Sequence, residues 1–240
     1  CKVNYYETEK MMHQFRELGF SVVDASEAAD IYVINTCTVT NMADRKSRQM
    51  IHRAKKKNPD SLVVAVGCYV ESAGEEALAD TALDAAFSNK DKNGNMAVKI
   101  LDYFSISAEG SQTEAAGVQE TDLQEVDYEG RERTRAYLKI QDGCNQFCSY
   151  CLIPYVRGKG ELSSMPPEEV VKKSEELAAH GYKEIVLTGI HLSSYGVDFS
   201  NVINFVRLEG RPLVEVIGKI AQIPGIERIR LGSLEPRIIT

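Results

Sequence analysis

The apolar positions in the first hundred residues follow two patterns. Short continuous runs at 31–34 and 62–66, rich in Val and Ile, are typical of strands buried in a parallel sheet. Between Glu7 and Leu18 the apolar residues instead have helical spacing, and the segment stops at Gly19, a residue that commonly ends helices. Strands and helices that alternate in this way predict an α/β fold with a parallel sheet.

A further helix is predicted over residues 44–58, ended by the proline that follows. We expect Met50, Ile51 and Ala54 on its inward face. Its basic residues are expected on the outer face: Arg45, Lys46, Arg48, Arg53, Lys55, Lys56 and Lys57. A basic face of this kind is either a solvated surface or a contact for phosphate groups, and the two interpretations are about equally supported by the sequence alone.

The second half of the chain repeats the alternation. Strands are predicted at 135–141, 184–187 and 228–231. The helix between the first two opens at Ser164 or Met165 with Pro and Glu in its first turn and closes at Gly181, and a second helix covers about 213–223. This βαβαβ order predicts the start of a (β/α) barrel, in which the chemistry lies at the carboxyl ends of the strands.

The two halves are separated by a polar segment. Residues 105–130 are rich in Ser, Gln, Glu, Thr and Gly, so this stretch buries little apolar surface and is expected to be a linker. The predicted organisation is an N-terminal α/β parallel-sheet domain over 1–104, an acidic linker over 105–130 and the first part of a partial (β/α) barrel over 131–240.

Three cysteines lie close together in the second half. Cys144, Cys148 and Cys151 have a Cys-x3-Cys-x2-Cys spacing directly after the strand predicted at 135–141. Three thiolates on so short a loop can each hold one iron of a cubane 4Fe-4S cluster, which leaves the fourth iron open to another ligand. The alternative is a zinc site with His191 as its fourth ligand, but the paired spacings that zinc usually has are absent from the sequence.

The other cysteines are scattered singly. Cys37 and Cys68 each follow one of the predicted strands, so both are expected at the carboxyl edge of the sheet, where ligands collect. Cys1 stands before the first helix, the place it would have if a strand had been trimmed ahead of it. Lone cysteines are most often small buried apolar residues, yet the shared placement of these three favours a second metal site. Neither group has the pattern of a disulfide framework, which favours a reducing, cytosolic compartment.

Composition adds little beyond the charge distribution. The chain of 240 residues has 43% hydrophobic and 26% charged residues, a net charge of −7 and a pI near 5.3. Seven acids and no Lys or Arg lie between Glu109 and Glu129, inside the expected linker. The acidic pI therefore does not argue against a basic binding face elsewhere.

The cysteine motifs resemble those of the radical S-adenosylmethionine (SAM) superfamily, and the segments Ile153-Pro154-Tyr155 and Arg157-Gly158 extend the likeness to its methylthiotransferase branch. The segments around Cys1, Cys37 and Cys68 resemble the three cysteine motifs of that branch's N-terminal domain, which hold an auxiliary 4Fe-4S cluster. The resemblance thus implies two 4Fe-4S clusters and SAM. It also implies SAM-binding positions at Tyr150, Thr188, Gly189, Ser233 and Glu235.

The neighbours of the first two cysteines resemble the subfamily that acts on N6-threonylcarbamoyladenosine in tRNA. That resemblance implies a cytoplasmic enzyme that puts a methylthio group on C2 of this nucleoside by radical chemistry, served by an electron donor such as flavodoxin and by a sulfur donor, with no membrane partner. It favours contact between tRNA and the basic residues Arg45, Lys46, Arg48 and Arg53. The alternatives are a relative acting on isopentenyladenosine or on a ribosomal protein, and a zinc-stabilised RNA-binding module without catalysis.

The sequence also differs from the family pattern in two respects. Where the family commonly has an Arg-Ser-Arg segment, residues 159–167 contain Lys159 as the one cation. The chain stops at Thr240, so we expect half of the barrel and the C-terminal RNA-binding domain of the family to be absent and the shortened chain to be inactive.

Overall fold

The computed structural model describes residues 1–89, 91–106, 135–199 and 210–236. The chain divides into two compact units: one is Glu7–Asp127, and the other joins Cys1–Tyr6 to Tyr128–Thr240. The linker predicted at 105–130 lies, apart from its first two residues, outside the described residues.

The unit Glu7–Asp127 is built on a parallel sheet with the strand order β1-β2-β3. The strands are β1 (Ile31–Thr36), β2 (Leu62–Gly67) and β3 (Ala85–Phe87). β1 and β2 pair along their whole length, from Ile31 opposite Leu62 to Thr36 opposite Gly67. The two apolar runs of the sequence are therefore neighbouring strands that end at the same edge, as predicted.

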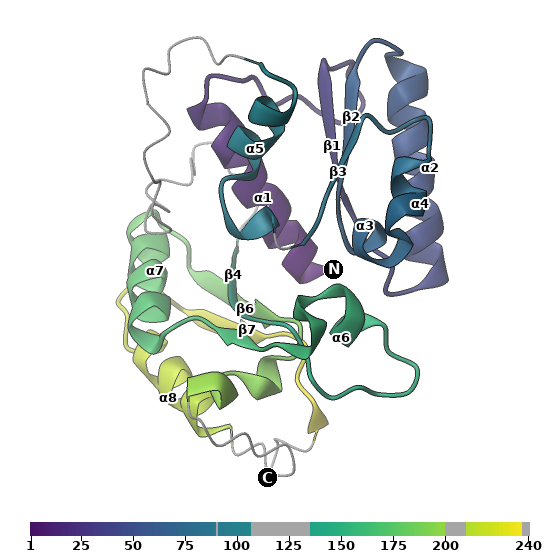
Figure 1. The fold of residues 1–240 in the computed structure, drawn as a ribbon. Helices are drawn as coiled ribbons and strands as arrows, with labels where there is room; N and C mark the ends of the chain where they lie inside the picture. Colours follow the sequence, from purple (N-terminus) through teal and green to yellow (C-terminus); the bar gives the residue numbers. More distant parts are fainter. Residues whose placement is uncertain (90, 107–134, 200–209, 237–240) are drawn as a thin grey trace. The chain divides into compact units, whose positions relative to one another are not determined.

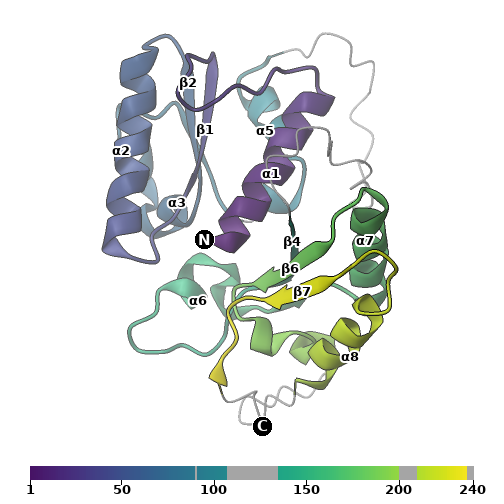
Figure 2. The same ribbon diagram turned by 180° about the vertical axis from the view of Figure 1, so that it is seen from behind.

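Helices cover both faces of this sheet, as Figures 1 and 2 show. One face packs against α1 (Lys2–Glu17), of which the part from Glu7 onward belongs to this unit, and against α5 (Met96–Tyr103). The other face packs against α2 (Asn41–Lys57), α3 (Cys68–Ala73) and α4 (Glu75–Leu78). A short 3-10 turn, η1 (Asp91–Asn93), precedes α5. Because both faces are buried, the strands are apolar throughout rather than alternating.

The helix α2 begins where its sequence allows a cap. The Thr40 hydroxyl accepts a hydrogen bond from the backbone N–H of Ala43 at 3.1 Å, which satisfies one of the free donors of the first turn. Ile51 and Ala54 are buried as predicted, but Met50 is exposed, so its assignment to the inward face was wrong. Ser47 is buried instead, one turn before Ile51.

The second unit is built on a sheet with the order β5-β4-β6-β7. β4 (Ala136–Asp142), β6 (Glu184–Gly189) and β7 (Arg228–Leu231) are parallel, and the two-residue β5 (Ser163–Ser164) is antiparallel to β4. α7 (Pro167–Ala179) and α8 (Arg211–Ile220) connect the parallel strands and pack on one face of the sheet (Figure 2). The predicted βαβαβ order is confirmed.

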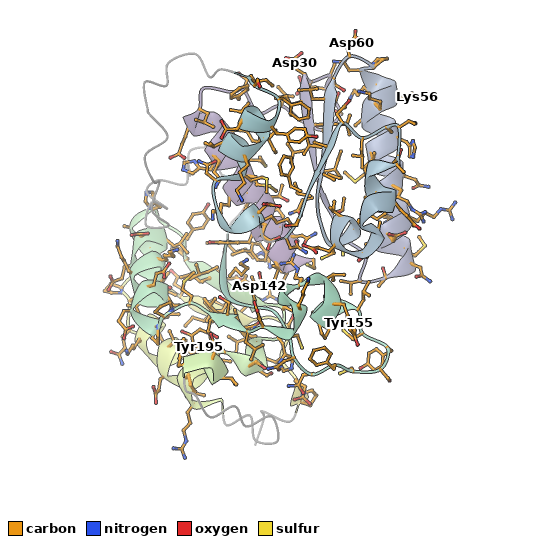
Figure 3. All side chains as sticks on the ribbon, viewed as in Figure 1. Asp30, Lys56, Asp60, Asp142, Tyr155 and Tyr195 are labelled. Atoms are coloured by element: carbon orange, nitrogen blue, oxygen red, sulfur yellow. The ribbon has the colours of Figure 1, made fainter. Side chains whose placement is uncertain are left out.

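Short helical turns fill the loops of this unit. They are α6 (Ile153–Val156), η2 (Gly158–Gly160), η3 (Leu192–Ser194) and η4 (Val197–Phe199). Tyr195, labelled in Figure 3, is fully buried next to η3 and donates its hydroxyl to the carbonyl of Met165 at 2.8 Å. Within the described ranges, no helix combines the length and the apolar character that crossing a bilayer requires.

Candidate metal centres

The carboxyl edge of the second sheet gathers the polar groups that the sequence singled out. The loop that carries Cys144 follows β4, Thr188 and Gly189 end β6, and Ser233 follows β7. β4 and β6 pair up to Gln141 opposite Gly189, so the cysteine loop and the end of β6 start from neighbouring positions. The predicted placement of these residues at strand ends is confirmed.

The cysteine loop is shaped by close backbone packing. Gly143 has a φ of +75°, and a side chain there would collide with the carbonyl oxygen of Glu161. Phe147, in the middle of the loop, also has a positive φ, of +46°. The backbone N–H of Cys151 donates to the carbonyl of Cys148 at 2.9 Å, which closes the loop into a turn.

The three thiols of this loop have different surroundings. Cys144 is buried, Cys148 is exposed, and Cys151 is partly exposed. Burial raises the pKa of the Cys144 thiol, the backbone N–H of Gln146 works against that rise, and the charges of Cys151 and Cys148 add to it. Mutual repulsion among three thiolates is relieved when a cation lies between them, so the donor set fits a metal cluster.

Neither group of three cysteines is arranged as a metal-binding site in the structure. Among residues that the structure describes, no three or more His, Cys, Asp or Glu side chains lie in an arrangement that would hold a metal ion. Coordination by Cys144, Cys148 and Cys151, and by the scattered cysteines, therefore stays a prediction.

Gln141 connects the cysteine loop to the end of β6. Its side chain is 1% exposed, and its Nε2 donates to the carbonyl of Gly143 at 2.8 Å. Its Oε1 accepts from the backbone N–H of His191 at 2.8 Å. A side chain at Gly189 would come within 2.8 Å of the same Oε1, so the glycine makes room for Gln141. This residue was not identified from the sequence, although a Gln that ends an alternating strand is a recognisable signal.

The expected SAM-binding residues occupy varied positions. The Thr188 hydroxyl is buried and has no hydrogen-bond partner within the described parts of the chain, as a group awaiting a ligand would be. Ser233 has a φ of +56°, and the backbone N–H of Glu235 donates to Ser193 at 2.7 Å. Tyr150 is 91% exposed. Contact between SAM and any of these residues remains a prediction.

His191 has a structural role in this edge. Its Nδ1 lies 2.6 Å from the hydroxyl of Ser194, within η3. Together with its backbone bond to Gln141, this contact explains the residue as part of the loop, which weakens the case for a zinc ligand.

A buried arginine forms an ion pair behind the cysteine loop. The Arg157 guanidinium is 3% exposed and lies 3.4 Å from both carboxylate oxygens of Asp142, the last residue of β4 (Figure 3). Asp142 in turn accepts from the backbone N–H of Gly143 at 2.8 Å. Arg157 also donates to the Asn4 side chain at 2.7 Å, within the same unit. The Arg-Gly segment that the sequence highlighted thus holds the start of the cysteine loop.

The carboxyl edge of the first sheet carries Cys37 and Cys68. Cys37 follows the last residue of β1, and Cys68 follows the last residue of β2 and opens α3. Because Thr36 and Gly67 are paired in the parallel register, both cysteines leave the sheet at the same edge, as predicted. Cys1 lies in the other unit and is exposed; its Sγ is 3.5 Å from the backbone nitrogen of Asn4.

Two buried hydroxyls fix the backbone around these cysteines. Ser47 accepts from the N–H of Cys37 at 3.0 Å and donates to its carbonyl at 3.1 Å. Thr36, 1% exposed, accepts from the N–H of Tyr69 at 3.1 Å. The sequence analysis missed both residues, although each is a polar residue at a position where the pattern would place an apolar one.

The basic face of α2 is exposed where the sequence placed it. Arg45, Lys46, Arg48 and Arg53 are all exposed, and Arg48 pairs with Asp44 at 2.9 Å. Lys56 also lies on the outer side of the helix (Figure 3). With Arg48, three of the seven cations thus have partners among the described residues: Lys55 binds Asp84 at 2.9 Å, and Lys57 donates to the carbonyl of Ser26. The remaining cations form an open surface, and nucleic-acid contact there stays a prediction.

Known proteins match both halves of the chain. Residues 1–88 match the uncharacterized protein family UPF0004, and residues 138–238 match the radical SAM superfamily. The chain is 42% identical to the threonylcarbamoyladenosine tRNA methylthiotransferase MtaB of Bacillus subtilis, over 100% of this chain and 51% of that protein. The MtaB of Aquifex aeolicus is 37% identical, over 98% and 54%.

A third relative bears a different name. The tRNA-2-methylthio-N(6)-dimethylallyladenosine synthase of Clostridium botulinum is 30% identical, over 100% of this chain and 51% of that protein. The chain spans about half the length of the curated relatives it matches.

A solved structure supports the fold. The radical S-adenosylmethionine methyltransferase TsrM of Kitasatospora setae matches with a TM-score of 0.53 at 14% identity, over 91% of this chain and 49% of that one. At this identity the likeness concerns the fold alone.

Proposed function

We propose that the chain, which belongs to the radical SAM methylthiotransferase family, is part of a tRNA methylthiotransferase. The proposed substrate is N6-threonylcarbamoyladenosine beside the anticodon. The observation that carries this proposal is the identity of 42% to a relative of that name over the whole of this chain. The presence of cysteines at the carboxyl edges of two separate parallel sheets supports it, since each edge suits one cluster.

In this proposal Cys144, Cys148 and Cys151 hold a 4Fe-4S cluster with one open iron, and Cys1, Cys37 and Cys68 hold a second cluster. A cluster and SAM bound at the first site supply a radical able to remove hydrogen from an aromatic C–H bond, which offers no handle to an acid or a base. Burial of Cys144 shields that side of the site from water.

The chain's own polar residues would orient the cofactor. The buried Thr188 hydroxyl provides a hydrogen-bonding group for the polar end of SAM, beside the β4 edge that Gln141 holds in place. Gly189, Ser233, Glu235 and Tyr150 are proposed for the same role. No general acid or base of the chain is assigned to the reaction.

The basic face of α2 is proposed as the contact for the tRNA phosphates. Arg45, Lys46 and Arg53 are exposed on a helix of the unit that carries Cys37 and Cys68. Lysine and arginine bind phosphates with a strong salt dependence, so tRNA binding should weaken steeply as salt rises. An electron donor such as flavodoxin, a sulfur donor and a cytoplasmic setting complete the proposal, the last because the spacing of the cysteines is not that of a disulfide framework.

Cluster content provides the first test. The chain is reconstituted anaerobically with iron and sulfide, and its iron is counted beside a Cys144→Ala/Cys148→Ala/Cys151→Ala variant. Two clusters predict about eight irons that fall to about four in the variant. Zinc binding without any cluster in either protein would refute the enzyme and leave the RNA-binding module.

The substrate requires a second test. The complete methylthiotransferase of which this chain is proposed to be a part is expressed in a bacterial host that lacks 2-methylthio modification, and the tRNA nucleosides are analysed by mass spectrometry. We expect the methylthio derivative of N6-threonylcarbamoyladenosine. The derivative of dimethylallyladenosine would instead assign the chain to the specificity that the Clostridium botulinum relative's name describes.

A further inference from the structure

Exposed aromatic side chains gather on the cysteine loop and on the short helix that follows it. Phe147 is 51% exposed, and Tyr155, on α6 (Figure 3), is 62% exposed. Two more exposed residues of large apolar side chain lie between them, Tyr150 and Leu152. Tyr150 is already proposed for SAM, which leaves Phe147 and Tyr155 without a role. Large apolar side chains that are exposed together commonly mark a binding surface.

The Phe147 and Tyr155 rings are fixed relative to each other. Their centroids are 5.8 Å apart and their planes meet at 79°, the edge-to-face arrangement that aromatic pairs favour. Phe147 also packs against Gly160, where an added Cβ would lie 2.7 Å from the Phe147 Cζ. The pair is therefore held in one arrangement before any ligand binds, which lowers the entropic cost of binding.

The backbone that presents this pair is strained. Phe147 has a φ of +46°, in a region that a bulky residue rarely occupies. Gly158, Lys159 and Gly160 also have positive φ values, of +76°, +51° and +85°. The left-handed conformation costs free energy at each residue that has a side chain, and strain of this kind is commonest at functional sites. Both Phe147 and Lys159 therefore stand out as residues held in place for a purpose beyond folding.

Lys159 adds a positive charge beside the aromatic pair. It is exposed, and it directly precedes Gly160, on which the Phe147 ring packs. Within the part of the chain that the structure describes, its ammonium group has no carboxylate partner. A cation next to aromatic rings suits a nucleotide, because the base can stack on a ring while the phosphate binds the cation.

The size of this surface also favours a nucleotide. A stable contact between two proteins takes about 800 Å² and roughly 20–30 residues from each partner. One base needs only one or two rings, provided that the base is unpaired and can leave its own stack. Two rings and one cation therefore match a single unpaired nucleotide better than they match an electron-donor protein.

We propose that Phe147, Tyr155 and Lys159 bind one unpaired nucleotide of the anticodon loop, its base against the rings and its phosphate against the ammonium. The proposal rests on the proposed function, because it takes tRNA as the substrate. Stacking accepts any base, so this site holds the loop without reading its sequence. Phe147 directly precedes Cys148, so the nucleotide is held beside the loop that is proposed to carry the radical SAM cluster.

The test compares two RNA probes on the complete methylthiotransferase of which this chain is proposed to be a part, reconstituted with iron and sulfide. One probe is a synthetic anticodon stem-loop, and the other is a fully paired RNA duplex with the same number of phosphates. Affinity is measured by fluorescence anisotropy. Phe147→Leu and Tyr155→Leu each remove a ring but keep an apolar side chain. We expect each to weaken stem-loop binding at least about fivefold and to leave duplex binding unchanged.

Phe199→Leu serves as the control for the loss of an exposed ring. Phe199 belongs to the same unit, is 46% exposed and lies edge-on to Tyr195, with the ring centroids 5.6 Å apart. This variant should bind both probes as the parent does.

The role of the cation is measured through salt. Lys159→Gln should weaken stem-loop binding and lower the slope of log affinity against log salt concentration by about 0.7, the value for one phosphate contact on a single strand. Lys183→Gln should leave that slope unchanged, because Lys183 is an exposed lysine of the same unit that already pairs with Glu227 at 2.7 Å.

Iron content and thermal unfolding are measured for every variant. Phe147 lies between Cys144 and Cys148, so the answer is taken from Tyr155→Leu if Phe147→Leu binds less iron. Stem-loop binding at the parental level in Tyr155→Leu would overturn the nucleotide site and leave the proposed function intact. If the same variant also slowed reduction of the cluster by reduced flavodoxin, the surface would belong to the electron donor instead. A parent that does not bind the stem-loop would refute tRNA as the substrate, and with it both proposals.

Discussion

Replacing Gly67 with alanine should damage the sheet edge that carries Cys37 and Cys68. Gly67 ends β2 with a φ of +104° and a ψ of −160°, a region of backbone conformation that is essentially restricted to glycine. An added Cβ would lie 2.7 Å from the carbonyl oxygen of Thr36, which belongs to the neighbouring strand. The substitution therefore forces both a strained backbone and a collision with a backbone atom that has little room to move.

The two effects can be added. Holding a residue with a side chain in such a conformation costs about 1–3 kcal/mol, and inserting a carbon into a packed site costs about 1–3 kcal/mol more. We expect Gly67→Ala to lower the local stability of this unit by about 2–6 kcal/mol. Even the lower limit of this range corresponds to an increase of about 30-fold in the equilibrium constant for local unfolding.

Hydrogen exchange read by mass spectrometry measures this effect in the unit concerned. Amides in peptides covering 31–36 and 62–67 should exchange at least about 30-fold faster in the variant, because local opening governs their exchange. Gly74→Ala is the matched control. Gly74 also has a positive φ, of +54°, but nothing lies within 4 Å of an added Cβ, so only the backbone cost of about 1–3 kcal/mol applies. If the two substitutions accelerated exchange equally, the collision expected between the added Cβ at position 67 and the Thr36 carbonyl oxygen would be refuted.

Three further predictions concern the other unit. Arg157→Met should cost about 2 kcal/mol in thermal or urea unfolding, because it removes a buried guanidinium and its bonds to Asp142 and Asn4, while Lys139 still pairs with Asp142. Arg228→Met, at a mostly exposed residue, should cost less than about 1 kcal/mol. Burial raises the pKa of Tyr195, and the nearby carboxylates add to the rise, so the folded protein holds this proton more tightly than the unfolded chain does. Stability should then fall as the pH rises above about 10, and urea unfolding at several alkaline pH values should show a smaller fall in Tyr195→Phe. Gly218→Ala, inside α8 with open space around the site, should stabilise by about 1 kcal/mol and raise the thermal midpoint of this unit.

Much of the fold was predictable because apolar periodicity is strong in this chain. β1 and β2 are continuous apolar runs, and both begin at the residue that the sequence predicted. Helix ends were less well predicted: α1 begins at Lys2 rather than Glu7, and its first turn buries Val3. The short elements α3 and β3 left no periodic signal, since a helix of six residues and a strand of three are shorter than the windows over which a period can be recognised.

The error at Met50 has a physical explanation. Hydrophobicity alone places a methionine inside, but the register of α2 is set by Ile51, Ala54 and the buried Ser47. Ser47 is drawn inward because both backbone groups of Cys37 need partners, and its hydroxyl provides them. A pattern that scores serine as polar and methionine as apolar rotates the helix face in the wrong direction.

The positions of the two cysteine edges were predictable, but the groups that shape them were not. Thr36 and Gln141 are each 1% exposed, and each lies at or one residue before the end of its strand. Thr36 binds the N–H that follows Cys68, and Gln141 binds the carbonyl that precedes Cys144. A buried polar side chain must bond to something, and at a strand end the nearest free partners are the backbone groups of the loop that follows.

This relation offers a general signal for such sites. An apolar strand that ends in a buried Thr or Gln, followed within a few residues by a metal-binding side chain, indicates that the polar residue shapes the loop rather than binding the ligand. The same logic extends to a charged group: the Lys92 ammonium is 4% exposed and bonds to Asn35, near the end of β1. In both units, the residues that hold the cysteine segments in place are therefore polar residues that are buried. The sequence shows that they are polar and the structure shows that they are buried, so both are needed to identify them.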